Sequence, residues 1–243
     1  MLIPAIFKTH RLIAAQSTRL NDLLQKTGKT PIEEFADTDD AFDRAHTRDE
    51  FLRQLGLKID KLAYSHQVHS NKVLVTDKPL SAEGYDAIIT NTKGVYVCVT
   101  IADCTPVLIY DAKNKAVAAI HAGWRGTVAK IVSETLNAMH KQYGTKGEDC
   151  VAFIGACICS KNFEVGDEVA EQFSAEEKTY NTEKKKYYVD LKLANKKQLM
   201  NFGVKESNIE ISEYCTVADN DKFYSYRYEK GKTGRMLALI GMK

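Results

Sequence analysis

The sequence predicts a single α/β domain over residues 1–243, with mixed β-sheets flanked by helices. Short β-rich runs follow one another between residues 60 and 121, and a helix with one apolar stripe follows them. No Gly/Ser/Pro linker and no internal repeat divides the chain. The composition, 44% hydrophobic and 27% charged residues, is typical of a globular protein with a substantial buried core.

The elements are predicted in chain order from hydrophobic periodicity. Residues 11–25 and 46–57 have helical spacing, and the acidic stretch 32–50 is interpreted as a loop or an irregular helix. The centre of the chain is predicted to form a sheet. Its strands are expected at residues 61–66, 71–77, 85–90, 95–102, 105–111 and 116–121.

The second half alternates helices and strands. A helix is expected at residues 127–143, where Gly144 lies just past its C-terminus. Further helices are expected at residues 167–173 and 191–202, the second with Asp190 as N-cap. Apolar strands are expected at residues 150–155 and 235–241.

Charge and targeting signals exclude several classes of function. The formal net charge is +2 and the basic residues are dispersed, apart from the run Lys184–Lys186, which we interpret as a solvated loop. We therefore expect no nucleic-acid partner. No signal peptide is recognisable and no window approaches about eighteen apolar residues, so we expect a cytoplasmic protein without a membrane partner. The oligomeric state is not predicted.

Six cysteines in a chain of this length, without an export signal, favour free thiols or metal ligands over disulfides. Cys98 and Cys150 lie within apolar runs and are expected to be buried.

The strands at residues 105–111 and 116–121 form a predicted hairpin. If Asp111 to Asn114 make its loop, Tyr110 pairs with Lys115 and the same register places Cys104 opposite His121. A thiol next to an imidazole suits a nucleophile and its base, two ligands of zinc or copper, or a buried structural pair. His69 precedes another strand and is a candidate third ligand, which would leave a fourth position open.

Several blocks resemble one family: QVHSNKV, DAIITNTKGVYVCVTIADCTPVLIYD, AVAAIHAGWRGTV, FEVG, DLKLAN and YSYRYEKGKTGRM, in this order over residues 60–243. The chain is similar here to the YfiH/LACC1 family, long labelled polyphenol oxidases or laccases and now regarded as purine nucleoside phosphorylases with adenosine deaminase activity. The resemblance implies a YfiH-like fold and an active-site zinc ion bound by His69, Cys104 and His121. It also implies purine nucleosides and phosphate as substrates.

The chain departs from the family pattern in places. Ser70 replaces the glycine that usually follows the QVH histidine, so the local turn is expected to differ. The usual N-terminal GG-containing segment is absent, and the resemblance gives residues 1–55 little support.

The remaining residues of HAGWRG suit an anion site. A helix starting near Thr127 would place Gly123, Arg125 and Gly126 at its N-terminus, where backbone N–H groups and a guanidinium favour phosphate. The two glycines would permit the turn and a close ligand approach. Trp124 has two interpretations, stacking on a purine or packing in the core.

Arg227 and Arg235 flank EKGKTG and are candidate substrate-binding residues, with surface ion pairs as the alternative. Asp103 is interpreted as a support for Cys104 rather than as a catalytic base.

Three other functions remain open at this stage. Cys104 and His121 would also suit a cysteine-dependent hydrolase, and the His69, Cys104 and His121 set would also bind a single copper ion in an oxidoreductase. A metal-binding protein without enzymatic activity is the third. A multicopper oxidase is disfavoured, because six dispersed histidines are too few for clustered copper ligands.

Overall fold

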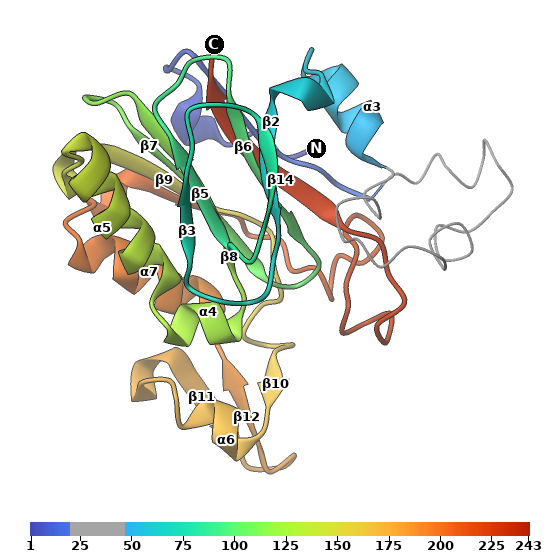
Figure 1. Ribbon diagram of the computed structural model, residues 1–243. Coiled ribbons are helices and arrows are strands. Elements are labelled where there is room, and N and C mark those ends of the chain that lie inside the picture. Colours follow the sequence, from blue (N-terminus) through green and yellow to red (C-terminus); the bar gives the residue numbers. More distant parts are fainter. Residues whose placement is uncertain (20–46) are drawn as a thin grey trace, which may run out of the picture.

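The computed structural model describes residues 1–19 and 47–243. Within these ranges, two β-sheets lie face to face between helices (Figure 1). Helices α5 (Ile131–Tyr143) and α7 (Leu191–Asn201) lie on one side, and α3 (Thr47–Gln54) lies on the opposite side. The mixed α/β architecture predicted from the sequence is confirmed.

The remaining α-helices are α4 (Trp124–Val128) and α6 (Asp167–Ala170). Single 3₁₀ turns lie at Ala5–Phe7, Ile59–Lys61, Gly147–Asp149, Ala175–Glu177 and Glu206–Asn208. The strands are β1 (Leu12–Gln16), β2 (Leu62–His66), β3 (Val73–Val75), β4 (Leu80–Glu83), β5 (Ala87–Thr90), β6 (Tyr96–Ile101), β7 (Thr105–Asp111), β8 (Ala116–Ala122), β9 (Cys150–Ile154), β10 (Glu164–Val165), β11 (Lys178–Asn181), β12 (Lys186–Val189), β13 (Ile209–Ile211) and β14 (Met236–Met242).

Both large sheets are mixed. One has the order β1-β14-β6-β2-β4 and the other the order β13-β9-β7-β8-β5-β3. Strands β6 and β7 follow one another in the chain but belong to different sheets. Residues 102–104, which connect them, therefore pass from one sheet to the other, and this crossing positions the site described below.

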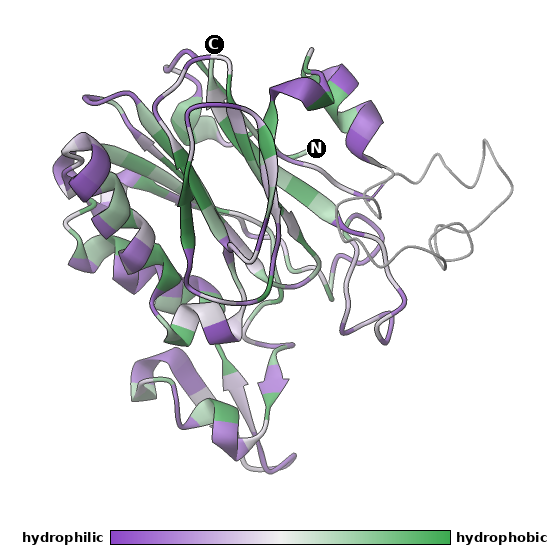
Figure 2. Cartoon of the chain, in the orientation of Figure 1, coloured by the Kyte–Doolittle hydropathy of each residue, from purple (hydrophilic) through white to green (hydrophobic). Residues whose placement is uncertain are grey.

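Three apolar layers pack against the faces of the two large sheets. Val107 and Ile109 of β7 face α5 and α7, whereas Leu108 and Tyr110 of the same strand face the other sheet. A third cluster, which includes Phe51, lies between α3 and the outer face of the sheet that contains β6 and β14. Because β6, β7, β8 and β14 are buried on both faces, their sequences are mostly apolar and do not alternate between apolar and polar residues. Figure 2 shows these apolar strands inside the molecule and hydrophilic residues on the helices.

Most central elements agree with the prediction, but two helical predictions need correction. Residues 12–16 of the expected helix 11–25 form strand β1, which pairs antiparallel with β14. The backbone partners offered by β14 outweigh the helical spacing of this short segment. Residues 20–25, like 20–46 generally, lie outside the described residues. The helix expected at 127–143 starts earlier, at Trp124, and is broken at Lys130, whose φ of 63° is left-handed.

The other helices are shorter than or close to the prediction. The N-cap at Asp190 is confirmed, since its side chain accepts a hydrogen bond from the Leu193 amide. Gly144 ends α5 with a φ of 74°.

The hairpin register differs from the predicted one by two residues. Tyr110 pairs with Val117 and Pro106 pairs with His121, and Cys104 precedes the strand. Asp111 belongs to the strand rather than to the loop, because its carboxylate accepts hydrogen bonds from the Lys113 and Asn114 amides and so closes a turn over residues 112–115.

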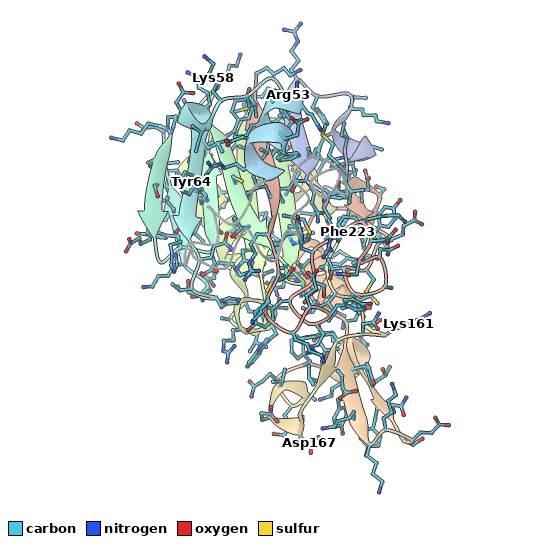
Figure 3. The ribbon with its side chains drawn as sticks, turned by 90° about the vertical axis from the view of Figure 1, so that its right-hand side faces the viewer. Arg53, Lys58, Tyr64, Lys161, Asp167 and Phe223 are labelled. Atoms are coloured by element: carbon cyan, nitrogen blue, oxygen red, sulfur yellow. The ribbon has the colours of Figure 1, made fainter. Side chains whose placement is uncertain are left out.

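A small three-stranded sheet, β10-β12-β11, projects from the two large sheets and was not predicted. In Figure 3, Lys161 lies where this part joins the body and Asp167 lies towards its far end. Of the basic run, Lys184 and Lys185 lie in a turn and Lys186 begins β12. In the described ranges, no helix is long and apolar enough to cross a membrane.

The layered core predicts that the free energy of unfolding depends on a buried isoleucine and not on an exposed one. Ile109→Ala, at a fully buried position, should lower the free energy of unfolding by about 2–5 kcal/mol, because it leaves a cavity between the sheet and the helices. Ile59→Ala, at a position 44% exposed, is the matched control and should change it by less than about 0.5 kcal/mol. Urea unfolding measures both, and equal losses would contradict the layered core.

Candidate metal-binding and active site

Three side chains from separate segments converge at one edge of the large sheets. His69 lies in the loop after β2, Cys104 lies at the β6–β7 crossing, and His121 lies in β8. One nitrogen of each imidazole and the sulfur of Cys104 all lie within 4.8 Å of one another. The Cys104 Sγ is 3.9 Å from His69 Nε2, and the two imidazole rings are 4.8 Å apart at an angle of 75°.

The buried carboxylate of Asp86 holds both histidines. Asp86 directly precedes β5, next to β8, and its backbone oxygen accepts the His121 amide at 2.7 Å. Its Oδ1 is 2.8 Å from Nδ1 of His121. The same carboxylate accepts the backbone N–H groups of Val68, His69 and Ser70. One fully buried side chain thus orients the imidazole of His121 and fixes the loop that presents His69.

The turn at His69 is left-handed, with a φ of 59°, which is uncommon for a residue with a Cβ. The three amide bonds to Asp86 stabilise it. Ser70 adds a further bond, since its hydroxyl donates to Asp86 Oδ2 at 2.8 Å. The residue that departs from the family pattern is therefore part of this network, and the turn is closed by Asp86.

Cys104 is held through its neighbour Asp103, which is also left-handed, with a φ of 83°. The carboxylate of Asp103 accepts the Thr216 hydroxyl at 2.5 Å and the Arg227 amide at 2.7 Å, and its backbone oxygen accepts the Ile158 amide at 2.9 Å. Because its carboxylate oxygens are engaged in this way, Asp103 fixes the crossing segment, in line with the supporting role expected from the sequence.

The two glycines of HAGWRG are needed for space rather than for a special backbone angle. A Cβ on Gly123 would lie 3.0 Å from the Cys104 sulfur and 3.0 Å from a carbon of the His69 ring. A Cβ on Gly126 would lie 3.1 Å from the Ser70 carbonyl oxygen. Neither glycine has a positive φ, so the structure shows a need for space at these positions and none for a left-handed backbone.

The charges of the cluster favour the ionised thiol. Burial would raise the pKa of Cys104, but the charge of His121 and hydrogen bonds from both histidines lower it overall. Burial would lower the pKa of His121, but Cys104 and Asp86 raise it overall. Burial also opposes ionisation of Asp86, yet its bonds to His121 and Ser70 lower its pKa to about 2. The thiolate is the form that binds metals and the form that attacks electrophiles.

A cavity of about 450 Å³ opens over the cluster. Arg125, Arg227 and Arg235 line it together with Phe163 and Tyr226. Its other lining residues are Gln67, His69, Thr100, Ile101, Ala102, Asp103, Cys104, His121 and Ile158. The structure thus brings the three candidate arginines and the three candidate metal ligands to one cavity, whereas their binding roles remain predictions.

Helix α4 differs from the helix that the sequence suggested for an anion site. The helix has only five residues and begins at Trp124, so Arg125 lies inside its first turn. Trp124 packs against an apolar cluster next to the small sheet that includes Phe173 and Val189. The Arg125 guanidinium lies 4.4 Å from the centre of the Trp124 ring. Of the two interpretations of Trp124, packing is the one that agrees with the structure.

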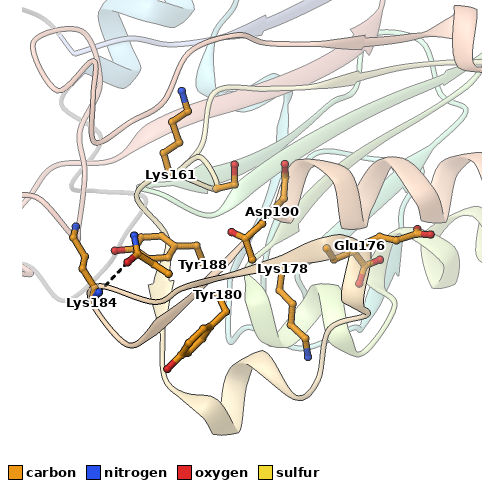
Figure 4. A pocket seen from close by; sticks show the side chains of 11 residues that line it. Lys161, Glu176, Lys178, Tyr180, Lys184, Tyr188 and Asp190 are labelled. Carbon is orange, nitrogen blue, oxygen red and sulfur yellow. Dashed lines mark hydrogen bonds between the residues drawn. The ribbon is translucent and has the colours of Figure 1, made fainter.

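A second cavity, of about 510 Å³, lies on the small sheet (Figure 4). It is lined by lysine, tyrosine and acidic residues and contains no histidine or cysteine. Its acidic residues have structural partners: Asp190 caps α7, Glu177 closes a capping box and Glu176 pairs with Lys197. The cavity over His69, Cys104 and His121 is therefore the candidate active site.

Comparison with known proteins shows the family to which the chain belongs. The sequence profile of the family described as "Multi-copper polyphenol oxidoreductase laccase" matches residues 32–243. The chain belongs to this family. It is 43% identical to a purine nucleoside phosphorylase of Bacteroides thetaiotaomicron over 197 residues, which cover 74% of this chain and 73% of that protein. It is 34% identical over 221 residues to adenosine deaminase RL5 of an unknown prokaryotic organism, covering 84% of each.

Solved structures of family members have the same fold. YlmD from Geobacillus stearothermophilus superimposes with a TM-score of 0.84 at 26% identity, over 99% of this chain and 94% of that one. YfiH from Bacillus licheniformis gives a TM-score of 0.76 at 26% identity, over 81% and 79%. The resemblance and the fold class expected from the sequence are confirmed.

The cluster fits a bound metal ion. Two imidazoles and a thiolate are ligands of zinc and copper. Because Asp86 contacts Nδ1 of His121, Nε2 of that ring remains to bind an ion, and such a carboxylate behind a histidine is common at metal sites. Gly123 leaves the space between the sulfur and the His69 ring free of a side chain.

The sequence did not point to Asp86 as a site residue. The signal was present, since Asp86 is a carboxylate at the start of an apolar run, YDAIIT, and a buried carboxylate requires partners. Gln67 was also missed. It exchanges hydrogen bonds with the backbone of Thr100 at the cavity wall.

Asp86→Asn should lower the affinity of the cluster for a divalent metal about 10–100-fold, because an amide cannot orient His121 and accept three backbone amides equally well. Competition with a chromogenic chelator measures this. Asp77→Asn, the same change at an exposed position, should leave the affinity unchanged. Wild-type affinity in Asp86→Asn would contradict the role assigned to this carboxylate.

Proposed function

We propose that this protein is a metal-dependent purine nucleoside phosphorylase that converts a nucleoside and phosphate into a purine base and ribose 1-phosphate. Adenosine deamination is proposed as a second activity of the same site. The observation that carries the proposal is a His-Cys-His cluster that opens into a cavity lined by three arginines and two aromatic rings. Relatives named purine nucleoside phosphorylase and adenosine deaminase support both activities.

His69, Cys104 and His121 are proposed to hold a zinc ion. A set of two histidines and one cysteine occurs in catalytic zinc sites, which keep a further position open for substrate or water. When bound, the ion would supply Lewis-acid chemistry at the floor of the cavity. Asp86 would keep Nδ1 of His121 protonated, so that Nε2 carries the lone pair.

Phosphate is proposed to bind at the arginines. Arg125 comes from α4, whereas Arg227 and Arg235 come from the C-terminal segment, so the positive charges surround the cavity from different elements. Arg227 is fixed by a bond from Nη1 to the Glu164 carbonyl at 3.0 Å and by the contact of its backbone amide with Asp103. Guanidinium groups bind phosphate oxygens through paired N–H donors, which suits this role.

The purine is proposed to lie against the aromatic part of the wall. Phe163 and Tyr226 line the same cavity, and Tyr226 is 56% exposed, so its ring is accessible to a ligand. A cavity of about 450 Å³ lies within the usual range of roughly 300–1,000 Å³ for small-molecule sites. Trp124 is partly buried against apolar residues and does not line this cavity, so Phe163 and Tyr226 are the aromatic candidates among the lining residues.

In phosphorolysis, a phosphate oxygen forms a bond to C1′ of the ribose while the bond from C1′ to the purine nitrogen breaks, and the purine takes up a proton. The arginines would hold the nucleophilic phosphate next to the ribose and offset the charge that develops, so positioning and electrostatics account for most of the expected rate gain. In deamination, the oxygen of water replaces the amino group of the purine, and ammonia leaves.

A single copper ion is the second candidate for the cluster, because the family description names copper and His₂Cys is also a copper ligand set. A multicopper site has less support: the part of the chain that the structure describes contains one group of His, Cys and acidic residues suited to a metal. Metal analysis of protein purified without added metal separates zinc from copper.

The decisive experiment incubates the purified protein with adenosine or inosine, with and without phosphate, and separates the products by chromatography. Ribose 1-phosphate that forms only with phosphate is expected. Cys104→Ala should lose the bound metal and the activity together. Cys98→Ala, at a buried position in the apolar layer next to α3, should keep both. Full turnover and full metal content in Cys104→Ala would refute the proposed ligand set.

The same product assay, run with a thiol alkylator or with a chelator, distinguishes this proposal from the cysteine-dependent hydrolase and from a non-enzymatic protein. A cysteine-dependent hydrolase using Cys104 and His121 would be inactivated by a thiol alkylator and would be indifferent to chelators. The proposed enzyme should lose activity with a chelator and regain it when zinc is added. Absence of turnover with every purine nucleoside in the presence of phosphate would leave a non-enzymatic metal-binding protein.

Arg125→Ala should raise the KM for phosphate by about tenfold or more while leaving metal content unchanged, because a charge-assisted contact is typically worth about 1.5–3 kcal/mol. Arg53→Ala is the matched control, since Arg53 is exposed on α3 and pairs with Glu50. If the KM for phosphate is the same in both variants, phosphate does not bind at Arg125.

A further inference from the structure

Two further cysteines lie together outside the proposed ligand set. The Asn162 side-chain amide is 3.4 Å from the sulfur of Cys159 and 3.3 Å from the sulfur of Cys215. The backbone N–H of Cys159 also donates to the Cys215 sulfur at 3.2 Å. The two sulfurs are thus bridged by one side-chain amide, although 56 positions separate Cys159 from Cys215 in the sequence.

The backbone holds the two segments side by side. Cys157 and Cys215 form a parallel β-bridge, and the Thr216 amide donates to the Cys157 carbonyl at 3.0 Å. The Cys215 amide donates to the Asp219 carboxylate at 2.9 Å. The proximity of the sulfurs therefore follows from paired backbone rather than from side-chain rotamers alone.

We propose that Cys159 and Cys215 are a site of reversible oxidation, at which a peroxide converts the two thiols into an intramolecular disulfide. Both are free thiols in this structure, and Cys159 is partly exposed, which gives a small oxidant access to the pair. The shared donor, Asn162, lies at the side of both sulfurs and suits the stabilisation of a thiolate.

The environment distinguishes the roles of the two sulfurs. Burial would raise the pKa of Cys215, but donors from the Cys159 thiol and from nearby amides lower it overall. Burial and the neighbouring Cys215 raise the pKa of Cys159. The Cys215 sulfur accepts N–H groups from the Cys159 backbone and from the Asn162 side chain, which stabilise a thiolate there, so Cys215 is assigned as the nucleophile and Cys159 as the resolving thiol. Cys157 is fully buried and burial raises its pKa to about 12, which makes it a poor competitor.

The chemistry is a two-electron oxidation. The Cys215 thiolate attacks one oxygen of hydrogen peroxide, so that an S–O bond forms, the O–O bond breaks and the departing hydroxide takes up a proton to become water. The Cys159 sulfur then attacks the Cys215 sulfur. The S–S bond forms, the S–O bond breaks, and the second hydroxide leaves as water with the Cys159 proton. A dithiol reverses the change by supplying two electrons and two protons.

The pair is connected to the active site through its sequence neighbours. Ile158, next to Cys159, lines the cavity and donates its amide to the Asp103 carbonyl. Thr216, next to Cys215, donates its hydroxyl to the Asp103 carboxylate. Because Asp103 directly precedes Cys104, a covalent bond between the two segments acts on the residue that fixes the crossing.

The test treats the full-length protein with hydrogen peroxide, blocks remaining thiols with an alkylator under denaturing conditions and maps the peptides by mass spectrometry. We expect a peptide pair joined through Cys159 and Cys215, lighter by two hydrogen atoms and separated again by dithiothreitol. Fragment ions must distinguish Cys159 from Cys157, because they lie close together in one peptide. Cys98 and Cys150, both in the core, should remain alkylatable thiols.

Variants make the assignment specific. Cys215→Ser and Cys159→Ser should each abolish the joined peptide, whereas Cys157→Ser should retain it. Asn162→Ala keeps both thiols and should slow formation of the disulfide several-fold. The mapping of the wild-type protein needs no variant to fold. A wild-type protein in which Cys215 joins Cys157 or remains a thiol, or in which the pair is oxidised only to sulfinic or sulfonic acids, would overturn the proposal.

Discussion

The buried carboxylate of Asp86 is the constraint on which the site depends. It accepts three consecutive backbone amides from the loop of His69 and contacts Nδ1 of His121 in the adjacent strand. An ionised carboxylate without partners would be costly in a buried position, so the loop and the imidazole stabilise Asp86 as much as it orients them. The lowered pKa of Asp86, about 2, expresses the same mutual dependence.

The second constraint is topological. Because β6 and β7 belong to different sheets, the chain must cross between them within residues 102–104, and the left-handed Asp103 makes the change of direction. Segments distant in sequence converge on this crossing: Ile158, Thr216 and Arg227 all bond to Asp103. The thiol of Cys104 is thus held by the frame of the fold, while the arginines and aromatic rings around it come from the surrounding loops and from α4.

Much of this was predictable from the sequence, for identifiable reasons. The central strands are apolar runs rich in β-branched residues, as expected for a sheet buried on both faces, and HAGWRG combines histidine, tryptophan, arginine and two glycines in six residues. The register of the β7–β8 hairpin was not predictable, since it depends on Asp111 closing the turn with its side chain. The sequence predicted that Cys104 approaches His121 because the two would lie opposite each other in the hairpin. In the structure Pro106 lies opposite His121, and Cys104 reaches His121 from the β6–β7 crossing. Strand β1 was not predicted, because the strand with which it pairs, β14, lies at the other end of the chain.

The layered core has a consequence for how such a protein diversifies. Strands β7 and β8, from which the floor of the cavity extends, have every residue buried, so almost any replacement there disturbs two packed interfaces at once. The rim is different, since Tyr226, which lines the cavity, is more than half exposed. Rim side chains such as Tyr226 can therefore change, and with them the shape and polarity of the mouth of the cavity, while Cys104 and His121 below stay where they are.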